Sequence, residues 1–293
     1  MDGAIVVDKA AGWTSHDVVN KMRRIAGTPR VGHLGTLDPA ATGVLPVVVG
    51  KATRLAQFYT RSDKIYEGVV RFGWATSTYD ADGTPAGEKR DATVDAAELE
   101  TALERFRGEI LQTPPPVSAK KVDGRRAYEL ARKQIPVELE PVKVRVHELE
   151  LLSLDGSGAR LRVHCSGGTY MRSIAHDLGT LLGCGAHLEE LRRLASGEFE
   201  IAGARTIPQL EALAADERLI DALVPASEML PAMASVYVEE ASVRDIRNGR
   251  NFPASPFRDR IDAHYVKAVT RQGELVAVGE IVVPNLYHPA VVL

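Results

Sequence analysis

The sequence predicts an α+β fold with a mixed sheet and a small β-rich module at its C-terminal end. Strand-like and helix-like segments alternate along residues 1–232, but without the regular rhythm of a doubly wound α/β domain. The segment P-A-S-E-M-L-P-A-M at 225–233 marks a boundary, after which residues 234–293 contain short strands and turns. A length of 293 residues exceeds one typical domain and agrees with a large domain followed by a smaller one.

Apolar periodicity, caps and turn residues predict the elements of the N-terminal half. In order, they are a strand at 4–7, a helix with Ser15 as its N-cap that ends at Gly27, a glycine-rich loop at 30–46, a strand at 64–72, a turn at 80–85, and a helix that begins at Thr93 or Asp95 and ends at Gly108.

A proline-rich break and a basic stretch follow the second predicted helix. T-P-P-P at 113–116 interrupts regular structure, and the basic stretch K-K-V-D-G-R-R follows at 120–126. A short helix is predicted next, at 127–133. The elements predicted beyond it are strands at 142–152 and 159–165, a helix from Tyr170 to about Leu182, a second helix at about 187–194, and strands at 236–238, 265–269 and 275–283.

Composition limits the functional classes. Hydrophobic residues make up 45% and charged residues 26%, which is ordinary for a soluble globular protein. We expect no membrane span, because no apolar run reaches about 18 residues, and no secretory signal is visible. Cys165 and Cys184 form no C-x-x-C pair, so we expect a reduced, cytoplasmic protein with two buried structural thiols. The net charge is −3, yet residues 1–80 and 116–175 have an excess of Lys and Arg that a polyanion could contact.

Several familiar chemistries do not fit. G-K-A-T at 50–53 lacks the spacing and the Ser or Thr after lysine that a phosphate loop needs. His33 and Asp38 have no neighbouring ligand cluster, so we expect no metal site. Asp38 is followed by proline rather than by the Thr/Ser-Gly of an aspartic protease, and a glycosidase requires two carboxylates where this loop offers one.

The stretch R-V-G-H-L-G-T-L-D-P-A-A-T-G-V-L-P at 30–46 displays one carboxylate on a rigid, apolar loop. Gly32, Gly35 and Gly43 permit unusual backbone angles or close approach of another chain, and Pro39 pushes Asp38 toward an extended conformation. A single Asp more often caps a turn, but this pattern indicates a carboxylate held in position.

The loop resembles the catalytic motif of the TruB-type pseudouridine synthases, the bacterial tRNA pseudouridine-55 synthases. Other motifs follow in the family's order: V-V-D-K-A-A-G-W-T-S at 6–15, S-D-K-I-Y at 62–66, D-A-D-G at 80–83, S-A-K-K-V-D-G at 118–124, C-S-G-G-T-Y-M-R at 165–172 and L-G-C-G-A-H-L-E-E-L-R-R-L at 182–194. The first motif departs from the family at Ala10, where proline is usual. The resemblance implies a pseudouridine synthase catalytic domain at 1–232, with an RNA-clamping insertion at about 113–135, and a shortened PUA-like RNA-binding module at 234–293.

The resemblance also implies roles for individual residues. Asp38 matches the catalytic aspartate, with attack on the ribose C1′, attack on the base C6 and a glycal intermediate all left open. Arg172 matches the arginine that pairs with it. Tyr66 matches the catalytic tyrosine that stacks on the target base and is expected to serve as general base during the sugar step. The implied substrate-binding residues are His33, which fills the space of the flipped base, Tyr170 and Leu191, which line the uracil pocket, and Lys9, which supports the loop or approaches the RNA backbone.

The implied activity is the isomerisation of uridine 55 in the T-loop of tRNA, without a cofactor or a metal ion. The expected partner is the T-arm of tRNA, with no membrane and no obligatory protein partner, and the chain is expected to be a cytoplasmic monomer. Two alternatives share the motifs or the RNA: a guide-RNA-dependent pseudouridylase, and a tRNA-folding chaperone that acts without catalysis.

Overall fold

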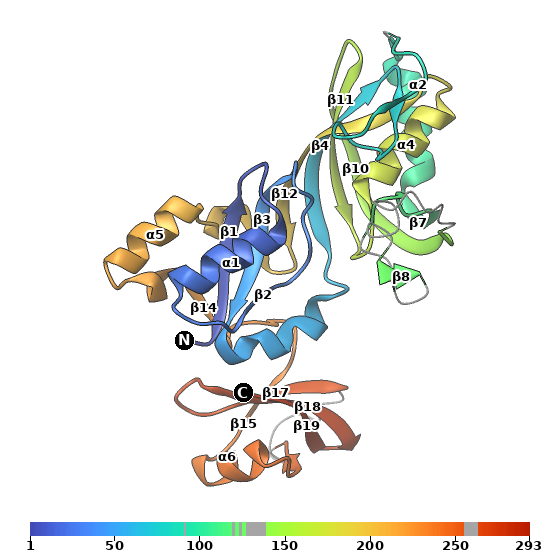
Figure 1. The fold of residues 1–293 in the computed structure, drawn as a ribbon. Helices are drawn as coiled ribbons and strands as arrows, with labels where there is room; N and C mark the ends of the chain where they lie inside the picture. Colours follow the sequence, from blue (N-terminus) through green and yellow to red (C-terminus); the bar gives the residue numbers. More distant parts are fainter. Residues whose placement is uncertain (91, 119–120, 123–124, 127–138, 255–262) are drawn as a thin grey trace. The chain divides into compact units, whose positions relative to one another are not determined.

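The computed structural model describes residues 1–293 except 91, 119–120, 123–124, 127–138 and 255–262 (Figure 1). The chain forms two compact units. The first contains residues 1–38, 44–60 and 198–293, and the second contains residues 39–43 and 61–197. The predicted helix at 127–133 lies outside the described residues.

The first unit is built on two groups of strands. β1 pairs with β14 and β3, and β2 pairs with β3, while the C-terminal segment forms a five-stranded sheet in the order β15-β17-β18-β19-β16. Its elements are β1 Gly3–Lys9, α1 Ser15–Ile25, β2 Val31–His33, β3 Thr42–Val49 (whose first two residues belong to the second unit), η1 Gly50–Tyr59, β13 Phe199–Glu200, η3 Ile201–Gly203, α5 Ile207–Ala215, η4 Leu219–Ala222, β14 Leu223–Pro225, β15 Ser235–Tyr237, α6 Glu240–Arg247, β16 Phe252–Pro253, β17 Tyr265–Val269, β18 Leu275–Val283 and β19 Leu286–Val292.

The N-cap of helix α1 is one residue earlier than the sequence predicts. Thr14, not Ser15, is the N-cap: its hydroxyl accepts the Asp17 N–H at 3.0 Å, and the Asp17 carboxylate accepts the Thr14 N–H at 3.0 Å. This reciprocal capping box satisfies two backbone donors of the first turn. The Ser15 hydroxyl is therefore available for another contact.

The C-terminal sheet shares a core with the N-terminal part of the first unit. Val269, Leu275 and Leu293 belong to the same buried cluster as Ala4 and Val44. A second cluster, which includes Val236, Phe252, Val266 and Tyr287, lies within the C-terminal segment itself. Removal of the C-terminal segment would thus expose apolar surface of the remaining first unit.

The second unit is a sheet in the order β12-β4-β11-β10-β7. Neighbouring strands in this order are antiparallel, whereas β12 runs parallel to the first two residues of β3, so the sheet is mixed, as predicted. Its elements are β4 Lys64–Phe72, β5 Ala75–Thr76, β6 Pro85–Ala86, α2 Ala96–Leu103, η2 Glu104–Phe106, β7 Gly108–Gln112, β8 Lys121–Val122, β9 Arg125–Arg126, β10 Val142–Asp155, β11 Gly158–Cys165, α4 Met171–Leu181 and β12 Ala186–Ser196.

The prediction of a helix at 187–194 is wrong, because this segment belongs to the strand β12. Two irregularities in its pairing with β4, between Leu188 and Glu190 and between Arg193 and Ala195, shift the inward-facing positions. The apolar residues then recur at a spacing that imitates a helix. A Cβ on Gly43 would lie 2.2 Å from the carbonyl oxygen of Arg193, so the close pairing of β3 with β12 requires glycine there.

Two further findings concern the expected environment. Both cysteines are free, but only Cys165 is buried and Cys184 is half-buried, so the expectation of two buried thiols is half right. Among the helices of the described residues, none combines the length and hydrophobicity needed to cross a membrane.

Candidate active-site residues in the two units

The loop that carries Asp38 joins β2 to β3 and is held by Ser15. The Ser15 hydroxyl donates to the carbonyl oxygen of Leu37 at 3.0 Å and accepts the Leu37 N–H at 2.9 Å. Both partners are buried: Ser15 is 4% exposed and Leu37 is 3% exposed. The residue directly before Asp38 is therefore fixed at both of its backbone polar groups.

Apolar packing and backbone pairing fix the rest of this loop. Leu34 and Ala41, on either side of Asp38, are buried, and the Leu34 N–H donates to the Pro46 carbonyl oxygen at 3.0 Å. Asp38 itself is partly exposed. The arrangement presents one carboxylate from a backbone that has little freedom, as expected from the sequence.

His33 is the last residue of β2, and its ring is oriented by its own loop. The Gly35 N–H donates to Nδ1 of His33 at 3.2 Å. Because Nδ1 accepts, a neutral His33 carries its proton on Nε2. The half-buried ring thus keeps a donor on the side away from the loop backbone.

Lys9 is 1% exposed at the end of β1. Its ammonium donates to the carbonyl oxygens of Ala10 at 2.9 Å and Trp13 at 2.8 Å. These contacts shape the turn before α1. Both contacts are to the turn before α1, so each of the two roles considered for Lys9 stays a prediction.

In the second unit, Tyr66 and Leu191 lie on the same face of neighbouring strands. Tyr66 is 8% exposed on β4, where it is paired with Arg193 of β12, and Leu191 is paired with Gly68, two residues further along β4. A Cβ on Gly68 would lie 3.3 Å from Cδ1 of Leu191, so the glycine leaves room for the leucine.

Tyr170 and Arg172 lie at the N-terminus of α4, which packs against β12 and β4. Tyr170 is the N-cap residue. Its N–H donates to Oε1 of Gln112 at 2.8 Å, and its carbonyl oxygen accepts from Nε2 of Gln112 at 3.0 Å. Gln112, which is 1% exposed at the end of β7, therefore holds Tyr170 by its backbone.

Arg172 is 6% exposed, and its guanidinium is held by the turn that follows β5. Nη1 lies 3.2 Å from Oδ2 of Asp80 and donates to the carbonyl oxygen of Thr78 at 3.2 Å. Between these two partners, Tyr79 has a left-handed backbone (φ 66°) and stacks on His176 of α4, with ring centroids 3.7 Å apart. Burial raises the pKa of Tyr79 and lowers that of His176, so both stacked rings stay neutral near neutral pH.

Three of these anchoring residues were not assigned by the sequence analysis. Ser15 was interpreted as a helix cap, Asp80 as part of a turn, and Gln112 was not singled out. Ser15 and Asp80 lie within motifs that resemble the family, which is a usable signal, whereas Gln112 has none. The pairing of Arg172 with Asp38 stays a prediction, and within the second unit the guanidinium pairs with Asp80.

Comparison with known proteins identifies the family. Residues 23–171 match the model of the TruB family pseudouridylate synthase N-terminal domain, and residues 172–231 match that of the tRNA pseudouridylate synthase B C-terminal domain. A protein named tRNA pseudouridine synthase B from Solibacter usitatus (strain Ellin6076) is 70% identical over 293 residues, which is 100% of both chains. A protein of the same name from Geobacillus thermodenitrificans (strain NG80-2) is 41% identical over 99% of this chain and 96% of its own.

The solved structure of a Cbf5-Nop10-Gar1 complex contains a similar chain, with a TM-score of 0.72, 28% identity, and coverage of 97% of this chain and 79% of that one. A second similar chain, from an archaeal box H/ACA sRNP Nop10-Cbf5 complex, has a TM-score of 0.70 and 27% identity over 95% of this chain and 78% of its own. These structures agree with the predicted α+β fold. Their sequence identity to this chain is lower than that of the two full-length relatives. The chain belongs to the TruB family of pseudouridylate synthases.

Proposed function

We propose that this chain converts uridine 55 in the T-loop of tRNA to pseudouridine, with Asp38 as the nucleophile and without a cofactor. The observation that carries the proposal is the full-length relative at 70% identity, whose name is tRNA pseudouridine synthase B. Both chains are covered completely, so every motif quoted above has a counterpart region in that relative. Because the proposed substrate is tRNA, we also propose that the chain acts in the cytoplasm.

The loop between β2 and β3 suits the nucleophilic role. The reaction breaks the bond between N1 and C1′, turns the uracil and forms a bond between C5 and C1′, while N1 gains a proton and C5 loses one. It needs a well-placed nucleophilic carboxylate, Asp38, and a general base, for which we propose Tyr66. Ser15 holds the backbone next to Asp38 at both polar groups. A fixed backbone reduces the entropy lost when the carboxylate meets the reacting atom.

Residues of the second unit suit the recognition of the uracil ring. Tyr66 offers an aromatic face, Leu191 an apolar wall, and Arg172 a guanidinium held by Asp80. In the proposed reaction, this guanidinium keeps the carboxylate of Asp38 ionised and oriented. The uridine must leave its stack, at a cost of a few kcal/mol, and His33 takes the vacated place.

A direct test uses the purified chain and an unmodified tRNA transcript, with pseudouridine mapped by carbodiimide primer extension. We expect one new pseudouridine at position 55, and none in a transcript with cytidine there. Asp38→Asn should reduce the single-turnover rate by at least about 10³-fold while the fold survives, because the amide is no longer a nucleophile. Asp155→Asn is the matched control, since Asp155 is an exposed carboxylate at the end of β10. A rate of about a tenth of wild type in Asp38→Asn would overturn the assignment.

The same assay separates the alternatives. A guide-RNA-dependent enzyme would leave the transcript unmodified when the chain is added alone. We propose instead that the chain acts as a monomer without guide RNA or partner proteins. A chaperone without catalysis would anneal tRNA but form no pseudouridine, so a fluorescence annealing assay with Asp38→Asn distinguishes folding activity from turnover.

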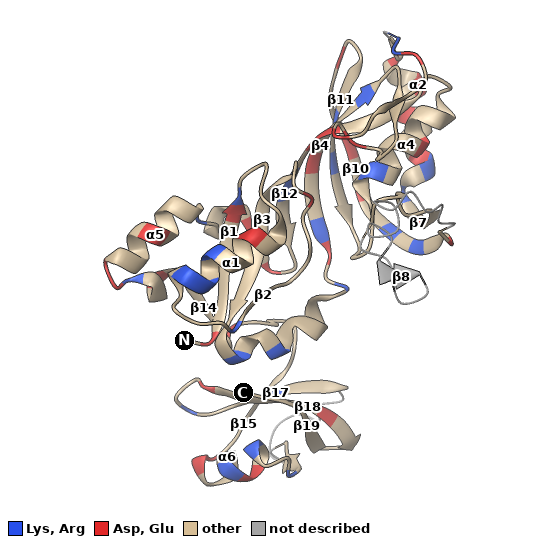
Figure 2. Ribbon diagram, in the orientation of Figure 1, with Lys and Arg blue, Asp and Glu red and all other residues tan. Residues whose placement is uncertain are grey.

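We further infer that residues 234–293 form an RNA-binding module of the PUA type, next to a catalytic part at 1–232. The support is a group of exposed arginines on and after α6, where basic and acidic residues are interspersed (Figure 2). Arg244, Arg247 and Arg250 are in the described part, where Arg247 pairs with Glu274 and Arg250 with Asp245 through exposed ion pairs. Arg258 and Arg260, which were predicted to act with them, lie outside the described residues.

This inference is tested by charge removal rather than truncation, because the C-terminal sheet shares a core with the N-terminal strands. The double substitution Arg244→Gln with Arg250→Gln should weaken tRNA binding and flatten its log–log salt dependence by roughly 0.7–0.9 per lost phosphate contact. The single-turnover rate at saturation should stay unchanged. Arg218→Gln, an exposed arginine paired with Asp221, is the control. Unchanged affinity and slope in the double variant would refute an RNA contact by these arginines.

A further inference from the structure

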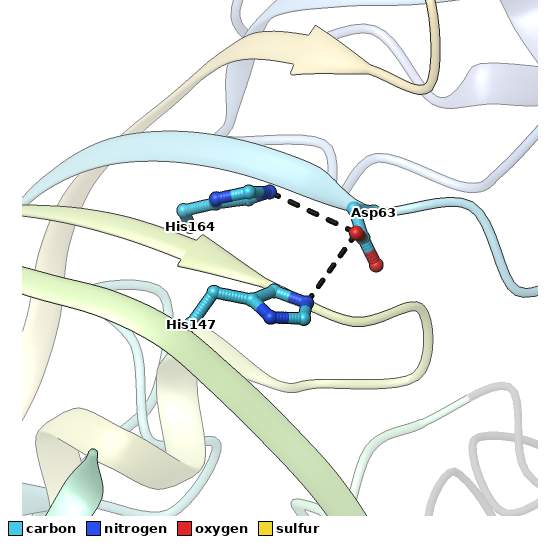
Figure 3. A group of neighbouring side chains, drawn as sticks. All are labelled: Asp63, His147 and His164. Atoms are coloured by element: carbon cyan, nitrogen blue, oxygen red, sulfur yellow. Dashed lines mark ion pairs between the residues drawn. The ribbon is translucent and has the colours of Figure 1, made fainter. Parts of the chain in front are cut away.

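Three side chains of the second unit converge at one edge of the outward sheet face, separate from the proposed active-site residues. They are Asp63, which directly precedes β4, His164 of β11 and His147 of β10. Oδ2 of Asp63 lies 3.3 Å from Nε2 of His147 and 3.8 Å from Nε2 of His164, and the three atoms all lie within 4.8 Å of one another. Figure 3 shows both imidazole rings directed toward the carboxylate.

An irregularity in the sheet creates this convergence. In the pairing of β10 with β11, Val146 is opposite Cys165 and Glu148 is opposite His164, so His147 is the extra residue of a bulge. Val146 and Cys165 are buried and face inward. The bulge turns His147 to the outer face beside His164, where the ring centroids are 4.7 Å apart.

Asp63 is held next to the two rings by its backbone. Its carbonyl oxygen accepts the Gly197 N–H at 2.9 Å, which ties it to the end of β12. The ammonium of its neighbour Lys64 bonds to the Ser62 carbonyl oxygen, and Lys64 is buried on the opposite face. The carboxylate is thus kept beside the imidazoles, while its side chain stays 48% exposed to solvent.

Two imidazole nitrogens and one carboxylate oxygen are the donor set that borderline divalent metals prefer. Around Zn²⁺, ligands at about 2.0–2.2 Å lie roughly 3.0–3.5 Å from one another. The carboxylate oxygen is 3.3 and 3.8 Å from the two nitrogens and no separation exceeds 4.8 Å, so side-chain rotations can bring the three atoms to that spacing. Three protein ligands leave at least one coordination position for water.

We propose that Asp63, His147 and His164 form a binding site for a divalent transition-metal ion such as Zn²⁺, which ties the start of β4 to the bulge of β10 across β11. We expected no metal site because the sequence has no ligand cluster at short spacing. These three residues come from separate segments that the sheet brings together. The site is independent of the proposed pseudouridine formation.

The chain contains an internal comparison for the simpler view that these contacts are surface ion pairs. Nε2 of His264 lies 3.0 Å from Oε1 of Glu280, and both side chains are exposed. This pair has one imidazole and one carboxylate, and no third His, Cys, Asp or Glu of the described residues joins it to make a group of three ligands. If the second imidazole makes the metal site, Zn²⁺ should bind at Asp63, His147 and His164 but not at His264 and Glu280.

The test uses full-length protein freed of metal with a chelator and then dialysed. Zn²⁺ binding is measured by competition with a chromophoric chelator for wild type, His147→Gln, His164→Gln, Asp63→Asn and the control His264→Gln. We expect one Zn²⁺ per chain in wild type and in the control, with at least about a tenfold loss of affinity in each of the other three. Zn²⁺ should raise the thermal midpoint of wild type but not of His147→Gln.

A Co²⁺ titration gives an independent readout, because nitrogen and oxygen ligation in a low-symmetry site yields visible absorption bands that His147→Gln should abolish. Absence of saturable Zn²⁺ binding in wild type would overturn the proposal. So would affinity that is unchanged in both His147→Gln and His164→Gln, or lost equally in His264→Gln.

Discussion

Replacement of Ser15 by alanine removes only one hydroxyl, but it should lower both the stability of the protein and the rate of pseudouridine formation. The hydroxyl makes two hydrogen bonds to Leu37, at 2.9 and 3.0 Å, and both residues are buried. Their loss leaves a backbone N–H and a carbonyl oxygen without these partners, next to the proposed nucleophile Asp38. A net value of about 0.5–1.5 kcal/mol for each bond gives a loss of roughly 1–3 kcal/mol in the free energy of unfolding.

The effect on the reaction follows from position rather than stability. A displacement of the reacting carboxylate by about 1 Å can cost about 10²-fold in rate. Ser15→Ala should therefore reduce the single-turnover rate on saturating tRNA by about 10- to 100-fold, with a smaller change in tRNA affinity. The assay is pseudouridine formation under single-turnover conditions, together with urea unfolding to measure stability.

Thr14→Ala is the matched control for Ser15→Ala. Thr14 caps the same helix and forms the capping box with Asp17, so its loss should cost about 1 kcal/mol of stability. Both side-chain hydrogen bonds to the Leu37 backbone described above come from Ser15, so Thr14→Ala should keep a single-turnover rate near that of wild type. A normal rate in Ser15→Ala, or an equal loss in Thr14→Ala, would refute the idea that Ser15 positions Asp38 through Leu37.

Three other outcomes are expected. Asp80→Asn should destabilise the protein by about 1.5–3 kcal/mol in urea unfolding and slow single turnover, because the buried guanidinium of Arg172 would lose one charge-assisted hydrogen bond; equal stability would show that this ion pair does not hold the arginine. Burial raises the pKa of Cys165 to about 11, so at pH 8 its thiolate is scarce and a disulfide reagent should titrate only Cys184 in the native protein and both thiols after denaturation; fast reaction of both in the native state would contradict this. Pseudouridine formation should continue in excess EDTA once the tRNA is folded in monovalent salt, and a loss that only zinc reverses would mean that catalysis uses a metal ion.

Strong local patterns explain where the sequence-based fold prediction succeeded. β4 has the predicted bounds because its side chains alternate between buried and half-buried along the whole strand. β11 and α4 begin within one residue of their predicted starts, since a D-G-S-G turn and the S-G-G-T segment mark them. The predicted bounds are thus confirmed where the local sequence pattern agrees with the burial of the residues in the folded chain.

The errors arise where the tertiary environment decides. β12 is central in the sheet, and its bulges produce a helix-like spacing of leucines that no local signal can distinguish from a helix. The loop predicted at 30–46 also contains β2 and most of β3. β2 pairs with the end of β3, beyond the predicted loop, and the start of β3 pairs with β12, which is distant in sequence. Helix α6 was missed in a segment interpreted as strands and turns. The metal-competent group around Asp63 exists only because three strands are adjacent and one of them is bulged.

A common arrangement connects the proposed reactive residues in the two units. Asp38 follows a leucine held by Ser15, Tyr170 is held at its backbone by Gln112, and Arg172 is held at its side chain by Asp80. None of these three anchors has a role in the proposed chemistry. They fix the positions of groups that do, so that little reorganisation is needed when the substrate binds. Sequence motifs identify the reactive residues by type. The positions of these residues depend on polar contacts between different helices, strands and loops, which are visible only in the folded chain.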